Sequence, residues 1–211
     1  KPRDVNYKLM KIRILKLLLL IFTINMIISC GNGKNIISKQ NEIDLKDSLA
    51  FELCKMYGLD QGVRESSGFK GKWNFIFSVD SLNFDRAMKF IKENGYPNEK
   101  LLGVKNYKNE CVSNSIFAIL LHNPHRIVNE RENYQTLLNE VKSNRLLPTD
   151  FANIIDKYYW LKKGNNKRVL VGSNFGKPCI ETKERTNQIR EEIGLKLLSD
   201  SEFINCEEKS L

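Results

Sequence analysis

The sequence lacks the short motifs by which many enzymes are identified. It contains no P-loop, no GxSxG nucleophile motif, no HExxH metal motif and no CxxC pair. Histidine is scarce: the sequence has two histidines, His122 and His125, in the stretch HNPH. Two histidines at this spacing could bind a metal, but no acidic residue accompanies them, so a structural role is the simpler interpretation. We therefore expect no cofactor and no metal.

The sequence also lacks a strongly basic domain, although its formal net charge is +9. Residues 1–29 carry +5 of this charge and residues 30–211 carry the other +4. A surplus of this size over the longer part is a mildly basic surface, which is weak evidence for nucleic-acid binding. We expect no nucleic-acid partner.

The apolar run from Leu17 to Ile28 is too short to cross a membrane. It has 12 residues, whereas a spanning helix needs about 20. Basic residues at positions 11, 13 and 16 precede the run. A basic segment followed by a short apolar segment is typical of an export signal.

The residues that end this run, Ile27-Ile28-Ser29-Cys30, resemble the lipobox of bacterial lipoproteins. The resemblance implies a diacylglycerol on the Cys30 thiol, cleavage before Cys30 and acylation of the new amino terminus. Two acyl chains are enough for stable anchoring. The alternative is an ordinary signal peptide with a cysteine there by chance.

We therefore expect upstream residues and a signal peptide over 1–29, a lipidated cysteine and flexible tether over 30–41, and one domain over 42–211. The chain would be a membrane-anchored lipoprotein of the bacterial cell envelope, with its domain in the periplasm. Four further cysteines, at positions 54, 111, 179 and 206, would then meet an oxidising compartment. We expect at least one disulfide among them. They allow three pairings, between which the sequence does not decide, and four buried free thiols remain an alternative.

The sequence pattern predicts one compact domain that is mainly α-helical with a few short β-strands, which is the α+β class. Apolar spacing predicts a first helix from Glu42, and a period of two in Trp73, Phe75, Phe77 and Val79 predicts a strand over 66–79. Asp80 would cap the helix that follows. Further helices are expected over 112–122, 129–144, 148–163 and 183–193, a strand over 167–171, and a short helix capped by Ser199 and Glu202.

Charged residues fall inside two apolar helix faces. If the first helix continues past Gly58, Asp60 and Arg64 lie on its apolar stripe and can pair, because they are four residues apart. If it ends at Gly58, Asp60 is an exposed turn residue. Asp156 lies among aromatic residues on a later helix, where it either takes a donor such as Arg64 or reaches water at the edge of the rings.

The order of several short motifs resembles an uncharacterised domain family of bacterial proteins that are often exported or lipid-anchored. The family's pattern is DQxxR, GWP with a nearby VG, QH, DR, YGTQ and RxxxGL. This sequence has Asp60-Gln61-x-x-Arg64, Gly95-Tyr96-Pro97, Gly103-Val104, Leu121-His122, Asp156-Lys157, Val171-Gly172-Ser173-Asn174, and Arg190 before Gly194-Leu195. These motifs span about residues 50–200.

The resemblance implies a polar cluster and not a reaction. Its members here would be Asp60, Gln61, Arg64, His122, Asp156, Asn174 and Arg190. Several polar residues of the family pattern are replaced, among them the Gln before the His, by Leu121. We therefore expect a binding or interaction module with a protein or small-molecule partner that the sequence does not identify. The alternative is a hydrolase-like enzyme in which an aspartate and His122 perform acid–base work.

Overall fold

The computed structural model describes residues 16, 40–65, 68 and 70–206. The chain divides into two units, residues 1–47 and 48–211. Cys30 and the residues around it, which carry the lipoprotein prediction, lie outside the described residues. Within the described part, 72% of residues are helical and no strand is formed. No helix there combines the length and the apolar character that crossing a membrane requires.

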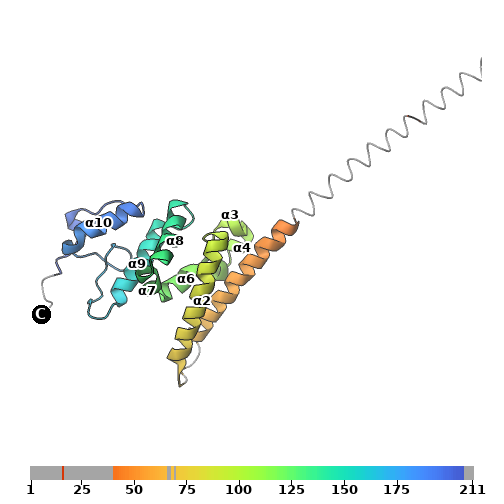
Figure 1. Cartoon of the computed structure of the whole chain (residues 1–211), viewed down its shortest axis with the longest axis horizontal. Coiled ribbons are helices and arrows are strands. Elements are labelled where there is room, and N and C mark those ends of the chain that lie inside the picture. The colour runs from red at the N-terminus through yellow and green to blue at the C-terminus, as the bar shows by residue number, and fades with distance from the viewer. Residues whose placement is uncertain (1–15, 17–39, 66–67, 69, 207–211) are drawn as a thin grey trace, which may run out of the picture. The chain divides into compact units, whose positions relative to one another are not determined.

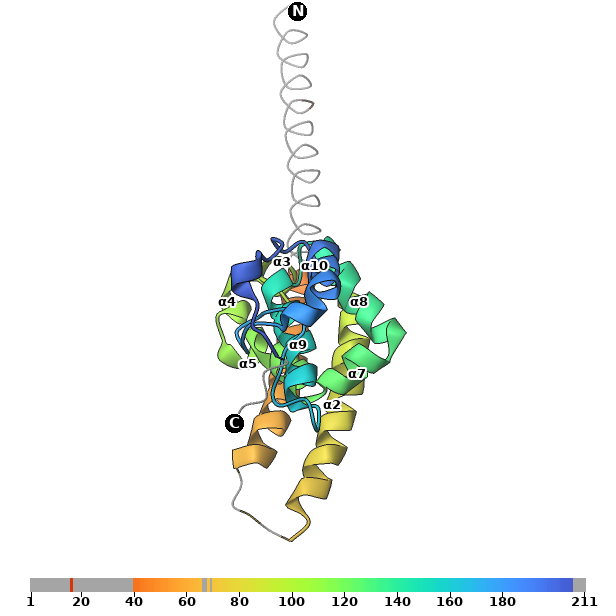
Figure 2. The same ribbon diagram turned by 90° about the vertical axis from the view of Figure 1, so that its left-hand side faces the viewer.

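A helical hairpin begins the second unit (Figures 1 and 2). Its first helix continues through Gly58 and Gly62 to residue 65, so the alternative that it ends at Gly58 is wrong. The second helix is α2 (Lys72–Asn94). The two helices are joined by side chains along their length, because the Asn83 amide donates to the Met56 carbonyl oxygen at 3.0 Å and Arg86 pairs with Glu52.

The strand predicted over residues 66–79 is wrong, because α2 begins at Lys72. The alternating aromatic residues are exposed, Trp73 by 70%, Phe75 by 51% and Phe77 by 65%. The buried residues recur at helical spacing, namely Ile76, Val79, Asp80, Asn83, Phe84 and Ala87. Burial of this stripe outweighs the local β-propensity of the aromatic residues. Asp80 is therefore a buried residue in the interior of α2 and not a helix cap.

Seven α-helices follow α2 before the C-terminal segment of the second unit. Most are short: α3 (Glu99–Leu102), α4 (Val104–Tyr107), α5 (Glu110–Ser113), α6 (Ser115–His122), α7 (Pro124–Asn129), α8 (Arg131–Lys142) and α9 (Pro148–Leu161). Helix α6 is the central one, since Ile116, Ile119 and Leu120 have 1% exposure or less. It packs between α2 and α9. The core thus fixes the relative positions of α2, α6 and α9, which carry Asp80, His122 and Asp156.

The C-terminal segment carries α10 (Lys183–Glu192) between two 3-10 turns, η1 (Ile180–Thr182) and η2 (Asp200–Glu202). Ser199 and Glu202 form the predicted capping box. The strand predicted over 167–171 is wrong, because this stretch makes only a single bridge, from Val169 to Pro178. Its backbone groups bond mainly to side chains instead, as described below.

Two disulfides join segments that are distant in sequence. Cys54 pairs with Cys111, and Cys179 pairs with Cys206. The first fixes the hairpin to α5, and the second closes the C-terminal segment. The prediction of at least one disulfide among these four cysteines is confirmed in the structure, and the alternative of four free thiols is not.

Candidate functional site

Asp60 is the centre of a polar cluster between the hairpin and α6. It is fully buried. Its carboxylate accepts hydrogen bonds from Gln61 Nε2 at 2.7 Å and from Arg64 Nη1 at 3.0 Å, and it lies 3.0 Å from His122 Nδ1. The predicted pair of Asp60 and Arg64 is therefore present, and Gln61 and His122 join it. A buried carboxylate needs such partners, because an uncompensated charge would cost several kcal/mol.

Asp80 is a further charged member of the cluster, beside Asp60 and Arg64. Arg64 donates through Nη2 to Asp80 Oδ1 at 2.6 Å, so one guanidinium serves two carboxylates. Sequence reasoning missed Asp80 because it treated this residue as a helix cap. Its position four residues after Ile76 and four before Phe84 was the available signal. A charge on an apolar helix stripe indicates a buried pair, as it did for Asp60.

Arg64 and His122 connect this cluster to a cavity of about 400 Å³, which we call the Arg64 cavity. Its other lining residues come from α2, α6 and α9: Lys72, Trp73, Ile76, Phe77, Asp80, Leu121, Lys157 and Leu161. The cavity therefore has mainly apolar walls, with three cationic side chains, one histidine and the Asp80 carboxylate, which pairs with Arg64. Such a combination suits a ligand with an apolar part and an anionic group.

His122 is the last residue of α6, as the sequence predicted, and its ring is oriented by Asp60. Because an ionised carboxylate can only accept, Nδ1 must carry the proton of this contact. Nε2 is then the ring nitrogen left for a ligand. His125 is exposed on α7 and lies outside the cluster. The two histidines do not form one site.

Three members of the cluster could in principle hold a metal ion. Ligand atoms of Asp60, Asp80 and His122 lie within 4.8 Å of one another. The Arg64 guanidinium already bonds to both carboxylates. A cation would have to displace this guanidinium, so the present geometry is that of an ion-pair network.

Asp156 belongs to a different set of contacts. It is fully buried in α9, and its carboxylate accepts from the backbone N–H groups of Leu170 at 2.8 Å, Val171 at 2.7 Å and Ser173 at 2.9 Å. Its donors are thus backbone groups and not Arg64. Burial raises the pKa of Asp156, and the three N–H bonds oppose this rise.

Arg190 and Asn174 lie with Asp156 and not with Asp60. The Arg190 guanidinium donates to the carbonyl oxygens of Val171 at 3.0 Å and Gly172 at 3.1 Å. Burial lowers the pKa of Arg190. The Asn174 N–H donates to the Asn153 side chain at 3.2 Å. The seven residues predicted as one polar cluster therefore form two sets, and within the described residues no hydrogen bond or ion pair joins the two.

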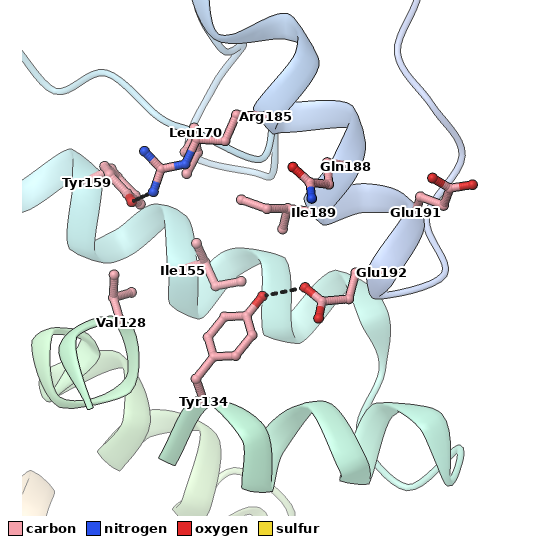
Figure 3. Close-up of a pocket in the computed structure, with 10 residues that line it drawn as sticks. All are labelled: Val128, Tyr134, Ile155, Tyr159, Leu170, Arg185, Gln188, Ile189, Glu191 and Glu192. Atoms are coloured by element: carbon pink, nitrogen blue, oxygen red, sulfur yellow. Dashed lines mark hydrogen bonds between the residues drawn. The ribbon is translucent and has the colours of Figure 1, made fainter. Parts of the chain in front are cut away.

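A larger cavity, of about 580 Å³, lies between α8, α9 and α10 (Figure 3). Four of its polar residues pair with one another: the Tyr134 hydroxyl donates to Glu192 at 3.3 Å, and Arg185 donates to the Tyr159 hydroxyl oxygen at 3.0 Å. Burial raises the pKa of Tyr134, so its hydroxyl stays a donor. No charged side chain that lines this cavity is buried within the part that the structure describes. The Arg64 cavity is therefore the better candidate for a functional site.

Comparisons with protein-family models, with curated proteins and with solved structures gave no match to this chain. The resemblance to the uncharacterised bacterial family rests on its motifs alone and stays a prediction.

Proposed function

We propose that this chain is a lipid-anchored protein of the bacterial cell envelope whose helical domain binds a small amphipathic anion in the Arg64 cavity. One observation carries the binding proposal. Arg64 and His122 line the cavity while buried Asp60 fixes both side chains from behind, at 3.0 Å each. Donors that are held in place before a ligand arrives lose little conformational freedom on binding.

The class of ligand follows from the walls of the cavity. Lys72 and Lys157 add positive charge, and Trp73, Phe77 and Leu161 provide apolar surface. A phosphate or carboxylate group would be bound by the cations, and an alkyl or aryl part would cover the aromatic side chains.

Decyl phosphate tests the proposal, with decyltrimethylammonium as a ligand of the same tail and opposite charge. The full chain with Trp160→Phe leaves Trp73, in the cavity wall, as the only tryptophan. We expect saturable changes in Trp73 emission with decyl phosphate and weaker ones with the cation. Lys157→Ala should weaken binding of decyl phosphate, whereas Lys142→Ala, on exposed α8 surface, should not. Equal responses to the two ligands would contradict the proposal.

The anchor is tested separately through Cys30. Replacement of Cys30 by Ser should abolish incorporation of labelled fatty acid, because serine has no thiol for the lipid transfer. The lipidated chain should partition with membranes and into detergent. A Cys30→Ser chain that still incorporates the label would overturn the anchor, and it would leave the binding proposal unaffected.

A hydrolase is the second candidate, and the Asp60–His122 contact supports it. A carboxylate that orients a histidine through Nδ1 leaves Nε2 free to accept a proton from water or a substrate. The lining residues of the Arg64 cavity within the described part include no Ser, Thr or Cys, so His122 would act by activating water. Hydrolysis of a p-nitrophenyl ester that disappears in His122→Gln, while decyl phosphate binding persists, would favour the enzyme. An unchanged rate would exclude this role for His122.

A further inference from the structure

Two stretches of the sequence contain no acidic residue, and the fold brings them together. Residues 66–79 include Lys70 and Lys72, and residues 157–180 include six basic residues, Lys157, Lys162, Lys163, Lys167, Arg168 and Lys177. Both stretches contribute side chains to the Arg64 cavity. Asp80 and Asp156, which adjoin these stretches, are buried, whereas Glu65 and Glu181 at the other ends are exposed. Of the basic residues in the two stretches, Lys72 and Lys157 line the cavity, and Lys167 lies beside the Trp160 ring.

Large apolar side chains are exposed on the same surface. Trp73, Phe77 and Leu161, exposed by 70%, 65% and 55%, line the cavity mouth. Lys157 also lines the cavity, and its Nζ lies 5.0 Å from the centre of the Trp160 ring and 5.2 Å from that of Phe175. The aromatic surface thus continues from α2 across the end of α9.

Further lysines lie beside Trp160 or follow it in the sequence. Lys167 Nζ lies 5.0 Å from the Trp160 ring centre. Lys162 and Lys163 are exposed directly after α9. We name these residues, from Trp73 and Phe77 on α2 to Trp160, Leu161 and the lysines at 162, 163 and 167, the basic aromatic face.

We propose that the basic aromatic face docks on an anionic lipid bilayer. Aromatic side chains favour the headgroup level of a membrane, because one part of the ring is apolar and another is polar. Lysines beside them are attracted by anionic headgroups, which complement the charge of this face. An anion without an apolar part would leave the exposed Leu161 and Phe77 side chains in water, and a nucleic acid would leave much of this apolar area in water.

The proposal does not depend on a ligand in the Arg64 cavity. The Arg64 cavity and the basic aromatic face nevertheless share Trp73, Phe77 and Leu161. Docking of the basic aromatic face places the cavity mouth at the headgroups. An amphipathic anion could then enter the cavity from the bilayer.

Tryptophan quenching by brominated lipids provides the test, because Trp73 and Trp160 are the only tryptophans in the chain. The full chain is reconstituted into vesicles of brominated phosphatidylcholine, alone or mixed with equal parts of brominated phosphatidylglycerol, and the vesicle-bound protein is isolated by flotation. We expect stronger quenching in the anionic vesicles, and we expect high salt to reduce it. The Trp73→Phe and Trp160→Phe chains should both retain quenching, because both tryptophans lie on the face.

A matched pair of triple variants tests the role of charge. The chain with Lys162, Lys163 and Lys167 changed to Gln should show a ratio of docked to undocked molecules lower by about a hundredfold, since each lysine near an anionic surface contributes about fivefold. The control chain changes the exposed Lys89, Lys105 and Lys142 to Gln, and it should dock like the unmodified chain.

Three results would overturn the proposal. One is equal quenching in zwitterionic and anionic vesicles. Another is flotation of the full chain without any quenching of Trp73 or Trp160, which would mean that the N-terminal part alone binds the vesicles. The third is displacement of the chain's tryptophans from lipid by a single-stranded oligonucleotide at low concentration, which would identify the face as a nucleic-acid surface. These quenching results do not depend on whether Cys30 incorporates a fatty acid.

Discussion

Asp156 and Arg190 bind the same short backbone segment through opposite ends of its peptide groups. Asp156 on α9 accepts from the N–H groups of Leu170, Val171 and Ser173, and Arg190 on α10 donates to the carbonyl oxygens of Val171 and Gly172. The segment has no neighbouring strand to satisfy these groups. Two buried charges therefore take over the role of a sheet, and each compensates the other across the segment.

The first prediction concerns this segment. In Asp156→Asn, the amide NH₂ can only donate, so it must face at least one backbone N–H that loses its acceptor. An unsatisfied buried donor costs about 1–3 kcal/mol. We expect a lower melting temperature and faster amide hydrogen exchange at one or more of Leu170, Val171 and Ser173, while Glu93→Gln, an exposed change on α2, alters neither. Exchange at these amides that stays as slow as in the unmodified chain would show that Asp156 does not hold the segment.

The sequence was sufficient to predict the Asp60–Arg64 pair and insufficient for the whole cluster. The pair was predictable because both residues lie on one helix, where spacing alone places them on one face. Asp80 contributes from another helix, and a period-two run of aromatic residues hid the helical stripe on which it lies. For residues 72–79, the period-two aromatic pattern and its β-propensity favoured a strand, whereas the spacing of Ile76, Val79 and Asp80 favoured a helix. Burial of the helical stripe decided between the two structures.

The role of Asp156 could not be predicted for a different reason. Its donors are backbone N–H groups of a segment without regular structure, and backbone donors leave no trace in the residue types. The disulfide pairing was equally hidden, because Cys54 and Cys111 are 57 residues apart and meet only through the packing of the hairpin against α5. Local patterns predict elements, whereas such contacts depend on the tertiary fold.

The second prediction compares one substitution at two glycines. Gly95 ends α2 with a φ of 86°, and a Cβ there would lie 2.9 Å from Arg145 Nε. Gly58 is helical, and no atom outside its own helix lies within 4 Å of a Cβ there. We expect Gly95→Ala to destabilise by more than about 1 kcal/mol and Gly58→Ala to stabilise by about 0.5–1 kcal/mol. Urea unfolding measures both, and changes of the same sign would contradict the assigned backbone geometry.

The third prediction concerns the disulfides. Alkylation of the protein without reductant should leave all four domain cysteines unmodified, and peptide mapping should recover the pairs 54–111 and 179–206. The two bonds close loops of 57 and 27 residues. Each restricts the conformations of the unfolded chain and so stabilises the folded protein by roughly 4 kcal/mol in the chain-entropy account. Reduction should therefore lower the melting temperature. Any other pairing in the peptide map would contradict the packing of the hairpin against α5.

The fourth prediction is a loss of stability in acid that depends on Glu140. This carboxylate is buried on α8, and it accepts from the Tyr96 N–H at 2.8 Å and from Arg145 Nη2 at 2.7 Å. Burial alone would raise the pKa of Glu140, but the Arg145 and Tyr96 hydrogen bonds outweigh it and lower the pKa. The stabilisation is then present above the unfolded-state pKa, about 4.3, and is lost as the pH falls through the lower folded-state value.

Unfolding free energies of the unmodified chain and of Glu140→Gln, measured from neutral pH into acid, test this sign. The difference between the two chains should be large at neutral pH and should shrink below about pH 4. Glu132→Gln, an exposed carboxylate on the same helix, serves as the control and should show little difference at any pH. A difference that grows toward acid would mean that the folded protein binds the proton of Glu140 more readily than the unfolded chain.

The fifth prediction concerns Arg64, on which the candidate site depends. Arg64 bonds to Asp60 at 3.0 Å and to Asp80 at 2.6 Å, so its removal leaves two buried carboxylates without their cation. Breaking such a network costs about 3–5 kcal/mol, which is a large share of a domain stability of about 5–15 kcal/mol. We expect Arg64→Ala to lower the melting temperature sharply. Arg131→Ala, the loss of an exposed arginine at the start of α8, should barely change it.

A double-mutant cycle separates this network from a general effect of losing an arginine. Asp60→Asn removes the charge that Arg64 compensates, so Arg64→Ala should cost less in that background than in the unmodified chain. Asp80→Asn should reduce the cost in the same way, because Arg64 serves both carboxylates. The triple change should therefore be less destabilising than the three single losses added. Strictly additive losses would mean that Arg64 acts independently of Asp60 and Asp80, and the cationic wall of the cavity would then lack the fixed support on which ligand binding is proposed to depend.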